Sequence, residues 1–288
     1  MATSFETPGM YGAYGGTATM ALVRDTFREA FARKIFWGFF GCSTAVILFF
    51  IFLMRIDVVE GALATISLFG KESRAVELSK LVRAVHGSLI AFLYGFGLFL
   101  AVFASAGLIP TIFEPGRIEL LLSKPVRRYH ILLGRYLGNV LVIAFNMLYL
   151  VLSVWIILGI KTEIWSYQFL WGILLTIFVF AVLLTIVLLV AVLSESAVLA
   201  TMVTFGVMIA GLIVAQKATL ERLLTSEWSR DVVRALYYAL PKVFDLGNMA
   251  RKLVIGTPID DWMPLWSTAL FGVVTLSAGL FAFSRRNY

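Results

Sequence analysis

The sequence has few of the residues from which catalytic and metal sites are built. Of its 288 residues, two are histidine and one, Cys42, is cysteine. A single cysteine excludes an internal disulfide, and the two histidines, His86 and His130, lie too far apart in the sequence to suggest a metal site. The sequence also lacks a G-x-x-x-x-G-K-[ST] loop for ATP phosphates, a G-x-S-x-G turn and an H-E-x-x-H motif. No catalytic, cofactor-binding or metal site is therefore predicted in this chain.

Six long apolar runs occupy most of the chain, which is 60% hydrophobic. A bilayer core about 30 Å thick needs roughly 20 residues of helix, so each run is long enough to span it. We predict an all-α membrane protein with six transmembrane helices, in which residues 1–18 are a flexible N-terminus and residues 19–288 a single transmembrane domain. The six runs are Ile35–Met54, Ser88–Ile109, Leu137–Ile160, Phe169–Leu193, Ala197–Ala215 and Pro264–Phe283.

The six runs also lack charge, since none contains Lys, Arg, Asp or Glu. Carriers driven by protons or ions usually hold ionisable groups within the membrane, where these serve as relays and counter-ions. An ion-driven mechanism within this chain is therefore not expected, and a partner must supply the energy for any active transport. The apolar interior favours amphipathic or lipid-like cargo, or a mechanical role, over a hydrated sugar.

The net charge of +7 is explained by basic residues next to the span ends, where they meet lipid headgroups, and not by nucleic-acid binding. An even number of spans places both termini on one side of the membrane. Because the positive-inside rule weights charges close to span ends, that side is predicted to be cytoplasmic. The basic residues on this side are Arg24, Arg28, Arg33, Lys34, Arg117, Lys124, Arg127, Arg128, Arg135, Arg285 and Arg286.

Two amphipathic regions accompany the spans. The segment Met20–Lys34 has one apolar stripe and one charged face, which predicts an elbow helix that lies in the membrane plane before the first span. Between the fifth and sixth runs, Trp228–Leu240 and Val243–Leu253 predict two short helices that dip into the outer leaflet. These helices could cap an exit path or form a folded loop without that role, and the residues leave both interpretations open.

The loop between the second and third spans reads FEPGRIELLLSKPVRRYHILLGRYLG over Phe113–Gly138. A turn at Glu114–Gly116 precedes a short predicted helix, Arg117–Leu122, and Pro125 is suited to the first turn of the next helix. A short helix between two turns, at the base of two spans, can push on both. It could dock a soluble partner, or its arginines could simply bind headgroups.

This loop resembles the motif of type-2 ABC exporter permeases, in which a Glu, a Gly and a Leu-Leu-Ser-x-Pro-x-x-Arg segment precede Leu-Gly-basic. The resemblance implies six spans, cytoplasmic termini, an N-terminal elbow helix and short outer helices between spans five and six. The sequence departs from the motif at Arg117, where many members have a small hydroxyl residue. The matching residues are Glu114, Gly116, Glu119, Leu121, Leu122, Ser123, Pro125, Arg128, Leu133, Gly134 and Arg135.

The resemblance further implies a permease domain that forms the translocation path as a dimer, with a second copy or a paralogue, in the inner (plasma) membrane. Two cytoplasmic ABC ATPase subunits would bind ATP and Mg and hydrolyse the ATP, and export is the expected direction. The alternative is a non-transporting membrane anchor or assembly factor of a multi-subunit complex, because the layout is also similar to permeases encoded with maturation systems for copper enzymes. The residues assigned to ATPase coupling are Glu114, Gly116, Arg117, Ile118, Glu119, Leu121, Leu122, Ser123, Pro125, Arg128 and Glu195.

Overall fold

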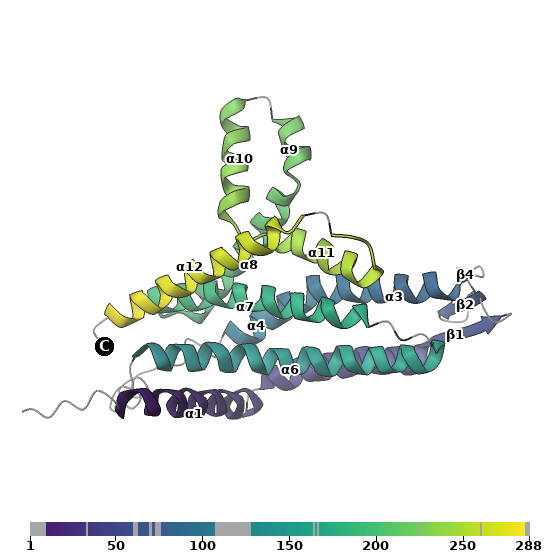
Figure 1. Ribbon diagram of the computed structural model, residues 1–288, viewed down its shortest axis with the longest axis horizontal. Coiled ribbons are helices and arrows are strands. Elements are labelled where there is room, and N and C mark those ends of the chain that lie inside the picture. The colour runs from purple at the N-terminus through teal and green to yellow at the C-terminus, as the bar shows by residue number, and fades with distance from the viewer. Residues whose placement is uncertain are drawn as a thin grey trace, which may run out of the picture.

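The computed structural model describes residues 10–32, 34–59, 63–68, 71–72, 76–106, 128–163, 165, 167–224, 226–259 and 261–285. Within these ranges the chain is a bundle of long, roughly aligned helices with one small sheet at one end (Figure 1). Among the described residues, five helices are long and apolar enough to cross a membrane, and a bent helix pair brings the number to six if it counts as one span. The predicted all-α membrane class is confirmed.

The bent pair lies at the start of the chain. Helix α1, Met10–Ala32, is followed by α2, Lys34–Leu48, and by the π-helical turn η1, Phe49–Leu53. The apolar parts of the pair, Met20–Ala32 and Phe36–Phe52, meet at an angle of 72°. An elbow is therefore present before the first span, although its helix begins earlier than the sequence suggested.

A small antiparallel sheet follows the first span, and the sequence analysis did not predict it. Strand β1, Met54–Val59, pairs with β2, Leu63–Leu68. The two-residue strands β3, Lys71–Glu72, and β4, Val76–Glu77, both pair with β2. Several residues of β1 and β2 are β-branched, which favours extended backbone.

Three further spans run back and forth through the bundle. Helix α3, Leu78–Phe92, continues through η2, Leu93–Gly97, into α4, Leu98–Ala106. Helix α6, Arg128–Thr162, has 35 residues and is about 52 Å long, so it extends beyond a bilayer core of about 30 Å. Helix α7, Gln168–Ser194, returns antiparallel to α6.

Helix α7 forms the centre of the bundle. It packs against α6, α8 (Ala197–Ala215), α11 (Val243–Ile255) and α12 (Met263–Arg285), and much of its length is buried. Glycines permit the closest approaches: a Cβ on Gly279 of α12 would lie 2.5 Å from Leu188 Cδ2 on α7. Small residues at such contacts let membrane helices pack tightly without a hydrophobic driving force between them.

Short helices lie between the last two spans, as predicted, but the described residues there form three where two were expected. Helices α9, Lys217–Leu223, and α10, Glu227–Ala239, project from the bundle across the direction of the long helices (Figure 1). Helix α10 has no buried residue. Helix α11, Val243–Ile255, differs from the expectation of two helices in the leaflet, because it packs against α3 and α7 and buries five of its residues.

Candidate functional site

Most of the residues assigned to ATPase coupling lie outside the described residues. Arg128 is the first residue of α6, and its side chain is also outside the description. The described parts of the site are therefore the first turns of α6, the helix α1 beside them, and the turn that carries Glu195. The residues outside the description are Glu114, Gly116, Arg117, Ile118, Glu119, Leu121, Leu122, Ser123 and Pro125.

A buried arginine connects the start of α6 to α1. The side chain of Arg135 is only 1% exposed, and its two terminal nitrogens each donate to an acid on α1. Nη2 lies 2.9 Å from Asp25 Oδ2, and Nη1 bonds Glu29 Oε2. Asp25 and Glu29 are four residues apart, so they occupy the same face of their helix. A buried charge is stable only when it is paired in this way, so Arg135 holds α1 in place beside α6.

The backbones of α1 and α6 approach closely next to this ion pair. A Cβ on Gly138 would lie 2.6 Å from Thr26 Cβ, a separation that side chains do not tolerate. One turn further along both helices, Ala30, Phe36 and Val142 form a small buried apolar cluster. Position 138 therefore requires glycine, and the contact between the two helices is continuous.

Polar groups continue along the same face of α6 into the bundle. Asn139 Nδ2 donates to the carbonyl of Ser105 on α4 at 3.2 Å, and Ser43 Oγ on α2 donates to Asn146 Oδ1 at 2.9 Å. Both asparagines are fully buried. Together with Arg135 they connect α6 to α1, α2 and α4, so these helices are coupled by polar contacts as well as by packing.

Glu195 forms the turn between α7 and α8. Its backbone is left-handed, with φ of 55°, and its N–H donates to the carbonyl of Ala191 at 2.8 Å. The next residue, Ser196, caps α8 by accepting from the N–H of Leu199. The hydroxyl of Tyr136, near the start of α6, donates to the carbonyl of Ala181 at the middle of α7. Because α7 runs antiparallel to α6, the turn at its end lies at the same end of the bundle as the start of α6.

The sequence matches the ABC-2 family transporter protein family over residues 20–288. The chain belongs to this family. It is a membrane permease component of an ABC transporter and a multi-pass membrane protein, and permeases of this family work with ABC ATPase subunits. No curated protein matches the sequence.

The ion pair was not predicted from the sequence. Arg135 was assigned to the loop motif, and Asp25 and Glu29 belong to the charged face of Met20–Lys34, for which no partner was predicted. Two acids at a spacing of four, opposite an arginine of the next basic segment, were the available signal. The spacing alone does not predict which arginine is buried.

Proposed function

We propose that this chain forms the translocation path of an exporter as a dimer, with a second copy or a paralogue, in the inner (plasma) membrane. Two cytoplasmic ATPase subunits would bind ATP and Mg²⁺ and act on the loop residues from Glu114 to Arg128 and on Glu195. Both termini would then be cytoplasmic. Membership of the ABC-2 family supports this proposal.

The observation that carries the proposal is the buried bond from Arg135 to α1. This arginine lies within the second turn of α6, directly after the proposed coupling loop. A force on the loop would enter α6 at its first residue and would reach α1 through the ion pair. Because α1 leads into the first span, α2, a displacement of α6 would also displace α2. The contact of Asn139 with α4 would carry the same displacement to a third span.

Co-purification tests the docking role of the loop. Changing Ile118 and Leu121 to Asp should abolish association with the ATPase subunit and leave membrane insertion intact, because two carboxylates would replace the apolar face of the predicted helix Arg117–Leu122. A matched control changes Val232 and Leu236 of α10 to Asp, which adds the same charge to a helix between the last two spans. If the loop variant still binds the ATPase, or if the control loses it equally, the docking assignment is wrong.

ATP hydrolysis separates a transporter from a membrane anchor. In the purified complex, a transporter should hydrolyse ATP at a rate that changes with the surrounding lipid or with added substrate. An anchor or assembly factor would leave the rate unchanged. Arg135→Met should reduce this coupling and leave ATPase binding in place, because the loop itself is intact in this variant.

A further inference from the structure

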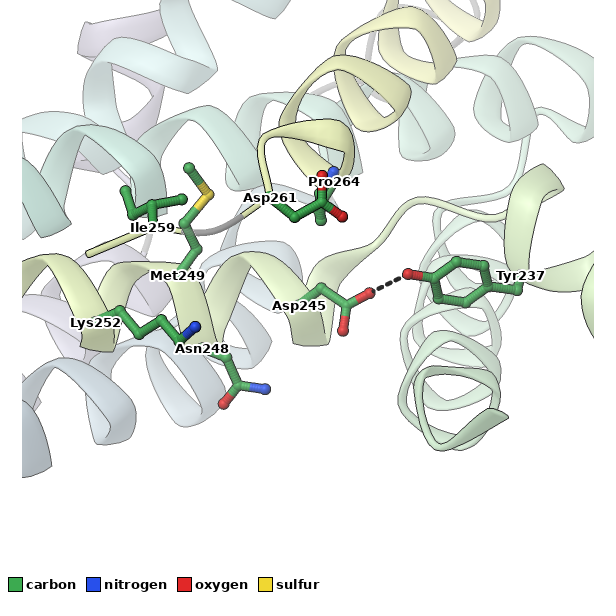
Figure 2. Close-up of a pocket in the computed structure, with 8 residues that line it drawn as sticks. All are labelled: Tyr237, Asp245, Asn248, Met249, Lys252, Ile259, Asp261 and Pro264. Carbon is green, nitrogen blue, oxygen red and sulfur yellow. Dashed lines mark hydrogen bonds between the residues drawn. The ribbon is translucent and has the colours of Figure 1, made fainter. Parts of the chain in front are cut away.

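A polar cavity of about 280 Å³ lies where α10, α11 and the start of α12 meet. Figure 2 shows that Asp245 and Asp261 approach it from two different segments, and that Tyr237 closes one side. The cavity is smaller than most sites for drug-sized molecules, so it suits a small polar group. Its lining residues are Tyr237, Asp245, Asn248, Met249, Lys252, Ile259, Asp261 and Pro264.

The cavity lies beside one end of a membrane-crossing helix. Pro264 is the second residue of the span Met263–Arg285, so the cavity is level with one end of a membrane-crossing helix. Trp262 and Trp266 flank this end and are 52% and 72% exposed. Exposed tryptophans at a span end are typical of the membrane–water interface. Lipid headgroups are therefore expected next to this cavity.

Two carboxylates in the cavity each keep one oxygen for a ligand. Asp245 Oδ2 accepts from the Tyr237 hydroxyl at 2.9 Å, and Asp261 Oδ1 accepts from the N–H of Met263 at 2.8 Å. Within the described ranges, the second oxygen of each carboxylate has no hydrogen bond. Burial and the bond to Asp245 raise the pKa of Tyr237, so its hydroxyl stays a donor to Asp245.

Positive charge borders the same cavity. Lys252 belongs to the lining. Behind Tyr237, the ammonium groups of Lys217 and Lys242 lie 3.8 and 4.6 Å from the centroid of its ring. Lys242 is buried, and its Nζ also donates to Ser267 Oγ at 3.0 Å. Lys217 and Lys242 contact the ring of Tyr237 and do not belong to the lining, which holds one lysine, Lys252, and two acids. The lining therefore carries charge of both signs, as a zwitterionic ligand does.

We propose that this cavity binds the headgroup of a zwitterionic phospholipid that has a primary ammonium, the ethanolamine type. The ammonium would lie between Asp245 and Asp261 and donate to their second oxygens and to the Asn248 amide. The phosphate would lie on the Lys252 side of the cavity. A choline headgroup fits less well, because its quaternary ammonium cannot donate hydrogen bonds and is usually held by several aromatic rings, whereas Tyr237 is the one ring in the lining.

Native mass spectrometry of the purified full chain in detergent micelles tests the proposal. The probes are phosphatidylethanolamine, phosphatidylcholine and phosphatidylglycerol with identical acyl chains, and soluble O-phosphoethanolamine. Two charge-assisted hydrogen bonds should give the ethanolamine lipid an advantage of about tenfold or more over the choline lipid. The double variant Asp245→Asn, Asp261→Asn should remove this preference. An asparagine can still accept from Tyr237 or Met263, so both local contacts survive the substitution.

Asp231→Asn is the matched control, because Asp231 is an exposed acid on α10 that pairs with Arg234 instead of lining the cavity. It should keep the preference for the ethanolamine lipid. Equal binding of the ethanolamine and choline lipids would overturn the proposal, and so would a preference that survives in the double variant. Tighter binding of phosphatidylglycerol than of phosphatidylethanolamine would mean that the cavity selects an anionic headgroup, and this result would also overturn the proposal. If soluble O-phosphoethanolamine competes as well as the lipid, the ligand is a soluble molecule and the lipid assignment is wrong.

Discussion

Glu29→Gln tests the ion pair that connects α1 to α6. The change removes one of the two charges that neutralise Arg135, which is 1% exposed, while the side chain keeps its size. Removing one partner of a buried pair costs about 3–5 kcal/mol. Because Asp25 still pairs with the other nitrogen, we expect the lower end, about 3 kcal/mol. Asp25→Asn is the control: Asp25 is 54% exposed and Glu29 only 13%, so the exposed pair should contribute less than about 1 kcal/mol.

Reversible unfolding in mixed detergent micelles measures both losses, and the same two changes are then repeated in an Arg135→Met background. If the cost of Glu29→Gln comes from an uncompensated buried charge, it should largely disappear once the arginine is gone. Equal costs for the two acids, or a cost for Glu29→Gln that persists without Arg135, would refute this reasoning.

Three further outcomes follow from single positions. Gly138→Val should cost about 1–3 kcal/mol by forcing α1 away from α6, and unfolding of the Gly138→Val, Thr26→Gly double variant should recover part of that loss. The pKa of Tyr237 is raised in the folded state, so above pH 10.0, the ordinary pKa of tyrosine, this side chain loses its proton in the unfolded state first, and stability should fall with rising pH. Tyr237→Phe should flatten that fall in a pH series of melting curves. Glu195→Gly should raise stability by about 1 kcal/mol because glycine adopts the left-handed backbone without cost, whereas Glu195→Ala should not; melting temperatures compare the two.

The spans could be predicted from the sequence because a run of about twenty apolar residues without a charge is long enough to cross a bilayer as a helix and has few other stable structures. The run Ala197–Ala215 coincides with α8, and Phe169–Leu193 differs from α7 by one residue at each end. The sheet was not predicted, since β1 and β2 are short and follow a span without a clear turn signal.

The position of α11 could not be predicted either. Its apolar face is the same whether it faces lipid or protein. Its place inside the bundle depends on tertiary packing against α3 and α7, for example on the close approach of Gly172 to Val254 and Ile90. The Arg135 bond depends on which segments pack together, and hydrophobic periodicity does not carry that information.

The central claim is that the loop after α4 and the Glu195 turn face the ATPase side of the membrane. Single cysteines at Lys124, Glu195 and Glu163, introduced after Cys42→Ser, can be labelled with a membrane-impermeant maleimide in sealed vesicles of both orientations. Glu163 follows the far end of α6 and serves as the opposite-side control. We expect the cysteines at 124 and 195 to react only in inside-out vesicles and the cysteine at 163 only in right-side-out vesicles. Reaction of the cysteine at 124 from the outside would contradict the account.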